Sequence, residues 1–271
     1  MKNSILLGFY RPIASFLFLL FFLIGCESPE DVQPSGRLSQ DRKGNSSNII
    51  YGKTMDLWGG TARVWVERVQ GKPIAIGIEL SAEALENLPH EVQEIVLPLP
   101  GPLHATGFKT VMIGWNPEGH EPAGVYTLPH FDFHFYMITE GQIHQIMGGI
   151  DQGGYDLQDR GVFPNVYTFG PVPFAVPHMG LHWSDVTSPE FSPAGFSKTF
   201  IYGSNQNRVT FLEPMITLAY LQSLSPGTSV ESPVRSLLIH DKPGYYPTSY
   251  TITRTGDSYI IALTDLVWRH K

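Results

Sequence analysis

The sequence predicts a β-rich fold, all-β or α+β, built as a single-domain barrel or sandwich with one or two short helices. The chain of 271 residues contains 27 Gly and 22 Pro, a content typical of many short elements joined by turns. Hydrophobic residues make up 42% of the chain and aromatic residues 12%, which is enough to fill a core. Segments that alternate apolar with polar residues, the pattern of a half-buried strand, recur along the chain.

The amino-terminal segment has the pattern of an export signal. Lys2 and Arg11 precede an apolar run, FLFLLFFLIG at residues 16–25, which ends at Cys26, the only cysteine. This run is shorter than the ~20 apolar residues needed to span a bilayer. The sequence Leu-Ile-Gly-Cys at residues 23–26 fits the lipobox, so residues 1–25 resemble a bacterial lipoprotein signal peptide. The resemblance implies cleavage before Cys26, lipidation of that cysteine, and attachment to a membrane of the bacterial cell envelope, in the outer membrane, facing the periplasm or the surface.

Removal of the signal peptide changes the charge and the chemistry of the chain. It leaves 16 basic and 25 acidic residues, a formal charge of −9, which argues against nucleic acid as a partner. With Cys26 lipidated, no free thiol remains, so disulfide bonds and cysteine nucleophiles are excluded. Residues 26–48 contain no aromatic residue and are too polar to offset their ordering entropy, so we interpret them as a disordered tether. The globular domain is expected at residues 49–271.

The domain is expected to open with a β-hairpin and a short helix. Apolar residues alternate at Ala62, Val64 and Val66 and, after a Gln-Gly-Lys-Pro turn, again over residues 74–80. Ser81 can act as the N-cap of a helix at residues 81–88.

The rest of the chain is predicted to hold more strands than helices. Strands are expected at residues 109–115, 125–138, 198–202, 208–211, 250–254 and 258–263. A second helix is expected at residues 213–223, with Pro214 in its first turn. The segment at residues 148–161, GGIDQGGYDLQDRG, is expected to be a mobile loop over a site, because its glycines disfavour a regular element.

The stretch HFDFHFY at residues 130–136 alternates His130, Asp132 and His134 with three phenylalanines. Successive side chains of a strand point to opposite faces, so the polar residues share one face and the phenylalanines the other. The aromatic surroundings predict that the polar face is enclosed, and enclosed His and Asp side chains need partners.

Histidines concentrate around this stretch. GHEP at residues 119–122 and PHMGLHW at residues 177–183 bring five of the ten histidines within 63 positions. Asp132 lies ~7 Å along the strand from both His130 and His134 and can share an ion with either, whereas the two histidines, ~13 Å apart, cannot share one. The other five histidines, which show no pattern, are His90, His104, His144, His240 and His270.

We expect a metal site on His134, Asp132 and His182, with His130 and His178 as alternates. His182 is favoured because Met179-Gly180 before it allows a tight turn that aims its imidazole at the sheet. Such a set suits zinc, or another divalent transition metal, with an open position for water. The ion would generate hydroxide near neutral pH.

A glutamate near the ion would shuttle the proton of the bound water. Glu121 and Glu213 are the two candidates for this catalytic role. The sequence does not rank them.

Other interpretations stay open. The cluster is alternatively a buried polar network or a structural metal site in a non-catalytic binding or structural module, or a solvated strand face. His120 is equally interpreted as a turn residue between Gly119 and Pro122. A small-molecule ligand and a homo-oligomer also remain open. The motifs of α/β-hydrolases, P-loop proteins and dinucleotide-binding proteins do not occur.

Two motifs carry a likeness to known proteins. WNPEGHEPAGVYTLPHFDFHFY at residues 115–136, taken with PHMGLHW at residues 177–183, resembles a family of exported bacterial proteins without an assigned reaction. The resemblance covers about residues 49–271. It implies a shared site at His120, Glu121, His130, Asp132, His134, His178 and His182.

Two further likenesses involve metal-binding sheets. Gly124, His130-x-Asp132, Glu140 and Pro177-x-x-Gly180-x-His182 are similar to the two metal motifs of cupins, but Asp132 replaces the second histidine and Glu140 is too distant. The strand FDFHF is similar to the zinc strand of α-type carbonic anhydrases, where a histidine stands in place of Asp132. Both imply a metal bound on a sheet.

Overall fold

The computed structural model describes residues 47–101 and 106–271, which belong to one compact unit of the chain. The expected signal peptide, Cys26, most of the expected tether and His104 lie outside the described residues. No helix among the described residues is both long and apolar enough to cross a membrane.

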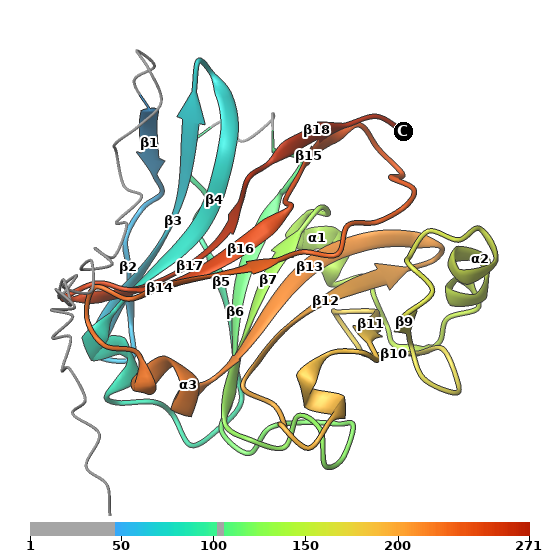
Figure 1. Ribbon diagram of the computed structural model, residues 1–271, viewed down its shortest axis with the longest axis horizontal. Helices are drawn as coiled ribbons and strands as arrows, with labels where there is room; N and C mark the ends of the chain where they lie inside the picture. The colour runs from blue at the N-terminus through green and yellow to red at the C-terminus, as the bar shows by residue number, and fades with distance from the viewer. Residues whose placement is uncertain (1–46, 102–105) are drawn as a thin grey trace, which may run out of the picture. The chain divides into compact units, whose positions relative to one another are not determined.

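Two antiparallel sheets of seven strands each form a sandwich-like arrangement (Figure 1). Sheet I consists of β1 (Ser47–Tyr51), β2 (Met55–Leu57), β3 (Gly60–Val69), β4 (Lys72–Ser81), β14 (Ser229–Pro233), β16 (Ser249–Arg254) and β17 (Ser258–Thr264). Its strand order is β1-β3-β4-β17-β16-β14, with β2 paired to β3. The β-rich class predicted from the sequence is confirmed.

Sheet II carries the HFDFHFY stretch. It consists of β5 (Gln93–Leu97), β6 (Thr110–Asn116), β7 (His130–Tyr136), β9 (Tyr167–Thr168), β11 (Leu181–Asp185), β12 (Lys198–Asn205) and β13 (Arg208–Thr217). The strand order is β5-β6-β7-β13-β12-β11-β9, so β7 lies inside the sheet between β6 and β13.

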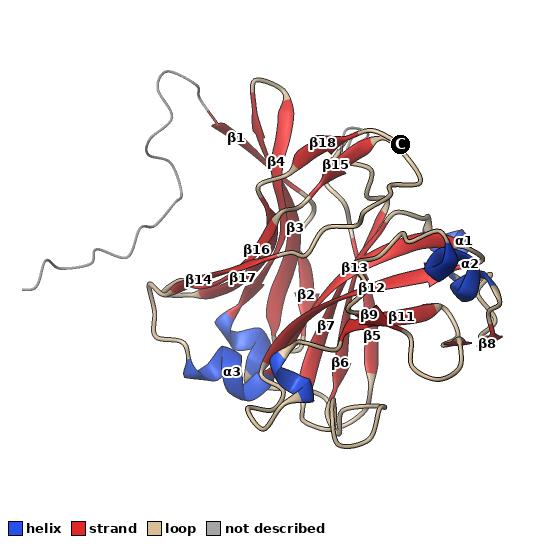
Figure 2. Ribbon diagram, turned by 45° about the vertical axis from the view of Figure 1, so that its right-hand side comes forward, coloured by secondary structure: helices blue, strands red, loops and turns tan. Residues whose placement is uncertain are grey.

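The remaining elements are short. Figure 2 shows the helices at the margins of the sheets: η1 (Ala82–Leu85), α1 (Glu140–Ile143), α2 (Gly153–Asp159), η2 (Pro189–Phe191) and α3 (Leu218–Ser223). Two small strand pairs complete the fold, β8 (Gly149–Ile150) with β10 (Phe174–Ala175), and β15 (Gly244–Tyr246) with β18 (Val267–Arg269).

The phenylalanine face of β7 packs in the core. Phe131, Phe133 and Phe135 have no exposed surface and belong to the same core as Ile76 and Ile78 of sheet I. Burial of each ring contributes on the order of 1.5–3 kcal/mol. A slip of β7 by one residue would place its His and Asp side chains in this core, so the burial of the rings fixes the register.

Most sequence-based boundaries hold. The hairpin predicted at residues 62–80 is β3 and β4, and the predicted short helix is the single 3-10 turn η1. The strand expected at residues 125–138 is limited to His130–Tyr136, because residues 117–129 form a loop that folds back over sheet II.

The helix predicted at residues 213–223 is wrong in its first half. Glu213 and Pro214 belong to β13, and only Leu218–Ser223 is helical. Pairing with β12 on one side and β7 on the other overrides the helical pattern. Proline is tolerated here because the ladder with β7 is interrupted between the Leu212↔Phe135 and Met215↔Asp132 pairs. Glu213 therefore projects from a sheet.

The prediction of a loop without regular structure at residues 148–161 is also wrong. This segment contains β8 and helix α2. The Asp151 carboxylate accepts hydrogen bonds from the backbone N–H groups of Gly153, at 2.9 Å, and of Gln206, at 2.9 Å. These bonds attach the start of α2 to the turn between β12 and β13, which orders the segment despite its glycines.

Candidate metal centre

The face of sheet II that carries His130, Asp132 and His134 is turned away from sheet I, and we call it the His/Asp face. The enclosure predicted from the sequence is confirmed, since the two histidines have no exposed surface and Asp132 is 3% exposed. Buried ionisable groups destabilise a fold unless they are paired or bind a metal. These three side chains therefore need partners.

Two loops cover part of the His/Asp face at the lower end of sheet II in Figure 1, residues 117–129 between β6 and β7 and residues 186–197 between β11 and β12. Glu190 joins them to the sheet, since its Oε1 accepts hydrogen bonds from the hydroxyls of Tyr126, at 3.3 Å, and Thr199, at 2.5 Å. These bonds hold the two loops against the sheet.

His120, His130 and Asp132 form the first triad. Nε2 of His130 lies 3.2 Å from Oδ1 of Asp132, and Nε2 of His120 lies 3.5 Å from Oδ2. His120 comes from the loop of residues 117–129, where its N–H donates to the carbonyl of Tyr126 at 2.9 Å. The other two residues come from β7.

The other ring nitrogens of the first triad are tied to the backbone. Nδ1 of His130 donates to the carbonyl of Leu128 at 2.7 Å, and Nδ1 of His120 donates to the carbonyl of Glu121 at 2.6 Å. A carbonyl oxygen only accepts, so Nδ1 carries the proton and Nε2 of the neutral ring offers a lone pair to the site. Nδ2 of Asn116 donates to Oδ2 of Asp132 at 2.7 Å. Hydrogen bonds of this kind orient metal-binding side chains.

His134, His182 and Glu213 form the second triad. Nε2 of His134 lies 3.4 Å from Oε1 of Glu213, and Nε2 of His182 lies 3.9 Å from Oε2. The ring of Phe211 packs 5.0 Å from that of His134 and 5.5 Å from that of His182. Three strands, β7, β11 and β13, thus converge on this triad.

Gly180 allows the start of β11 to lie close to β12, beside the second triad. Gly180, before His182, adopts a φ of +103°, and a Cβ there would lie 2.2 Å from the carbonyl oxygen of Ser204. The tight turn predicted at Met179-Gly180 is confirmed by the bond from the Gly180 N–H to the Val176 carbonyl, 2.8 Å long. A side chain at position 180 would push His182 away from the sheet.

Several ligand-type atoms of the two triads have no hydrogen-bond partner although they are fully buried. They are Nε2 of His130, Oδ1 of Asp132, Nε2 of His134 and Oε2 of Glu213. Each such atom costs about 1–3 kcal/mol. Two atoms that each bind one ion at about 2.1 Å in tetrahedral geometry lie about 3.4 Å apart. The N···O distances of 3.2 to 3.9 Å fit that arrangement better than hydrogen bonds.

The pKa values of the carboxyl groups of Asp132 and Glu213 are shifted in opposite directions. Burial alone would raise the pKa of Asp132, but the neighbouring imidazoles of His120 and His130 outweigh it and lower that pKa. Burial raises the pKa of Glu213 well above its ordinary value, and the charge of Asp132 adds to the shift. Burial also lowers the pKa of His134 to about 4, which keeps this imidazole in the neutral form that binds metals.

The structure regroups the residues singled out from the sequence. It places Asp132 with His130 and His120, and places His134 and His182 with Glu213. His178 belongs to neither triad, since its ring packs against His144 at 5.5 Å. Glu121 is exposed beside His120 and accepts its hydrogen bond through the backbone. The sequence pointed to His120 only through the family resemblance, because its place beside Asp132 depends on how the loop of residues 117–129 closes.

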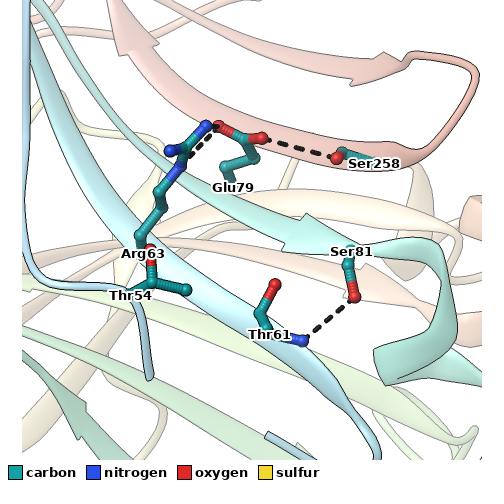
Figure 3. A pocket seen from close by; sticks show the side chains of 6 residues that line it. All are labelled: Thr54, Thr61, Arg63, Glu79, Ser81 and Ser258. Carbon is teal, nitrogen blue, oxygen red and sulfur yellow. Dashed lines mark hydrogen bonds and ion pairs between the residues drawn. The ribbon is translucent and has the colours of Figure 1, made fainter. Parts of the chain in front are cut away.

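A polar cleft lies on the outer face of sheet I. Figure 3 shows this cleft of about 260 Å³, lined by Thr54, Thr61, Arg63, Glu79, Ser81 and Ser258. Nη2 of Arg63 donates to Oε2 of Glu79 at 2.8 Å, and the Ser258 hydroxyl donates to Oε1 at 3.4 Å. Both charged groups of this cleft are hydrogen-bonded, Arg63 to Glu79 and Glu79 also to Ser258.

Comparisons of the chain with protein-family models, with curated proteins and with solved structures found no match. The likeness of its two motifs to exported bacterial proteins stays a prediction. The function is therefore inferred from the two triads.

Replacement of Glu190 by Gln is expected to change the pH dependence of stability. Burial raises the pKa of Glu190, against the effect of its hydrogen bonds, so above pH 4.5 the native chain holds a proton that the unfolded chain releases. The free energy of unfolding of the wild type therefore falls as the pH rises above 4.5. The variant has no carboxyl group at position 190 and does not lose stability in this way. The free energy of unfolding of Glu190→Gln, measured in urea, should rise relative to wild type from about pH 4 to about pH 8. Parallel curves would contradict the assignment.

Proposed function

We propose that this domain binds two divalent transition-metal ions, one in each triad. The observation that supports this most is the set of buried, unpartnered nitrogen and oxygen atoms at the spacing of ligands around one ion. Each triad offers two imidazoles and one carboxylate, a set that binds catalytic zinc and also non-haem iron. Zinc is the expected ion, because it accepts nitrogen and oxygen ligands without a redox requirement.

Each proposed ion would have three protein ligands, which leaves a fourth position for water. One histidine of each triad reaches solvent, since the side chains of His120 and His182 are 35% and 25% exposed. A bound zinc would lower the pKa of its water to near 7 and supply hydroxide. In this arrangement Glu213 is a ligand, and Glu121, exposed beside His120, is the candidate proton shuttle. This supports a metal-dependent enzyme that acts through bound water.

One observation favours a second, non-catalytic role. Burial lowers the pKa of His120, but the neighbouring Asp132 outweighs it and leaves that pKa raised, so without an ion the first triad becomes an ion-paired network. Such a network would fasten residues 117–129 to β7 in a binding or structural module. Metal content distinguishes the two roles.

Zinc-supplemented protein comprising residues 27–271, which holds all described residues, should carry two zinc ions per chain after dialysis. His120→Ala and His182→Ala are each expected to retain one, because each removes a partly exposed ligand from a different triad. Inductively coupled plasma mass spectrometry measures the ratio.

His178→Ala is the matched control, since His178 stands in PHMGLHW but outside both triads, and it should keep both ions. Well-folded wild type without zinc would refute the metal proposal and favour the polar network.

The hydrogen bond from Asn116 to Asp132 should affect the zinc affinity of the first triad and not that of the second. Asn116→Ala is expected to weaken zinc binding there by about 10- to 100-fold, the usual effect of losing such a bond. Competition with a chromophoric chelator measures both affinities. An equal loss at the second triad would indicate a general structural effect.

We also propose that the mature chain is anchored in the cell envelope by lipid on Cys26. The lipobox at residues 23–26 supports this. Radiolabelled palmitate should be incorporated into wild type expressed in a bacterial host and not into Cys26→Ser. Equal labelling of the two would exclude Cys26 as the acceptor.

A further inference from the structure

One ribbon of the structure exposes apolar side chains along its length. β8 pairs with β10, which places Ile150 opposite Phe174. Both side chains are exposed, as are Met147 just before β8 and Val172 and Val176 on either side of β10. Met147 is 82% exposed, more than any other exposed large hydrophobic residue of the described ranges. We call these five residues the apolar ribbon, and β8 lies at the right-hand margin of Figure 2.

The backbone holds these side chains on the outside. The two valines and Phe174 alternate along the chain with Pro173 and Ala175, which are buried, and residues paired directly across two antiparallel strands project from the same face. Backbone hydrogen bonds fix the ribbon, since the N–H of Asp151 donates to the carbonyl of Pro173 at 2.8 Å and that of His178 to the carbonyl of residue 146 at 2.9 Å. The apolar side chains therefore cannot turn into the core while the ribbon stays paired.

No charged side chain interrupts this part of the chain. Residues 141–150 and 161–184 contain no Lys, Arg, Asp or Glu, although such residues make up 16% of the sequence. Exposed apolar patches are typical of surfaces that contact another protein or a membrane. The absence of charge matters because a charged group that leaves water without a partner destabilises the contact. The apolar ribbon can therefore leave water without burying a charge.

A membrane fits the apolar ribbon better than a second protein does. A stable protein interface takes about 20–30 residues from each partner, whereas the ribbon offers five apolar side chains. Two copies of the mature chain would also repel each other, because each has a formal charge of −9. A bilayer needs only a few inserted side chains when the domain is already held at its surface.

The lipid proposed on Cys26 would hold the domain at that surface. Residues 27–46 separate this cysteine from β1, and these 20 residues span at most about 70 Å. A domain of 225 residues, the number from Ser47 to the end of the chain, is about 45 Å across. The length of the connecting segment thus allows the ribbon, wherever it lies on the domain, to reach the membrane.

We propose that the apolar ribbon is a membrane-contact surface, which inserts Met147, Ile150 and Phe174 into the headgroup region and upper acyl chains of a zwitterionic phospholipid bilayer. The inference goes beyond metal binding and rests on the proposed anchor at Cys26. A zwitterionic surface is the expected partner because the charge of −9 repels the mature chain from anionic lipids. Insertion would limit the ways in which the anchored domain can turn at the membrane.

Vesicles that carry the anchored domain test the proposal. Protein of residues 26–271, in which Cys26 is the only thiol, is coupled through that thiol to a maleimide lipid in phosphatidylcholine vesicles. Phe174→Trp places an indole on the ribbon, and lipids brominated in their acyl chains quench only an indole that enters them. The added emission should be quenched and shifted to shorter wavelength. Ile150→Asp in the same chain should abolish both effects, because it places a charge beside the indole.

Leu128→Trp serves as the control. Leu128 is exposed and lies just before β7 begins. The ribbon approaches the other end of that strand, where the Tyr136 hydroxyl donates to the carbonyl of His178 at 3.5 Å. The added emission of Leu128→Trp should not change when the protein is coupled to the same vesicles.

Equal quenching of the two added indoles, or none at position 174, would overturn the proposal. A dimer of uncoupled protein that Ile150→Asp converts to a monomer in analytical ultracentrifugation would also overturn it, and would identify the ribbon as an interface between copies. The coupling supplies the anchor in vitro, so the result does not depend on the palmitate experiment. Quenching at position 174 alone, in a chain that bacteria do not lipidate, would support the membrane contact and refute only the anchor.

Discussion

The site depends on one constraint, the alternation of ionisable with aromatic side chains along β7. Burial of three phenylalanines against sheet I fixes the register of the strand, and the same register forces His130, Asp132 and His134 to the opposite face. Because two loops enclose much of that face, the polar atoms lose water without gaining enough hydrogen bonds. The energy of the aromatic core thereby maintains an arrangement of ionisable groups that would not be stable alone.

The triads contain the same kinds of ligand in unlike settings. The first is held by hydrogen bonds outside it, from Asn116 and to backbone carbonyls, so its geometry is set before any ion binds. The second relies on packing against Phe211 and Tyr136, and its carboxyl group, Glu213, favours the protonated form. If each triad binds an ion as proposed, the two are therefore expected to differ in affinity and in the pH dependence of that affinity.

Local patterns predicted the strands well and the site only in part. The alternation at residues 62–80 and 130–136 is a property of consecutive residues, so it could be predicted. The expected grouping of Asp132 with His134 and His182 was wrong, because Asp132 lies with His130 and His120. Glu213 was assigned to a helix because Pro214 suits the first turn of one, and only pairing with β7 and β12 reveals the strand. The grouping of His182 with Glu213 spans three strands, and the role of His120 depends on how its loop closes. Neither is encoded in local sequence.

The triads differ in the length of chain they connect. The first triad, with Asn116, lies within residues 116–132, so the β6–β7 hairpin and its loop supply every member. The second joins residues 134–213 and exists only when β11, β12 and β13 are in place. Contacts between nearby residues form sooner in folding than contacts across a sheet. An ion taken up by the hairpin would thus accompany early maturation of the chain, and occupancy of the second position would report its completion.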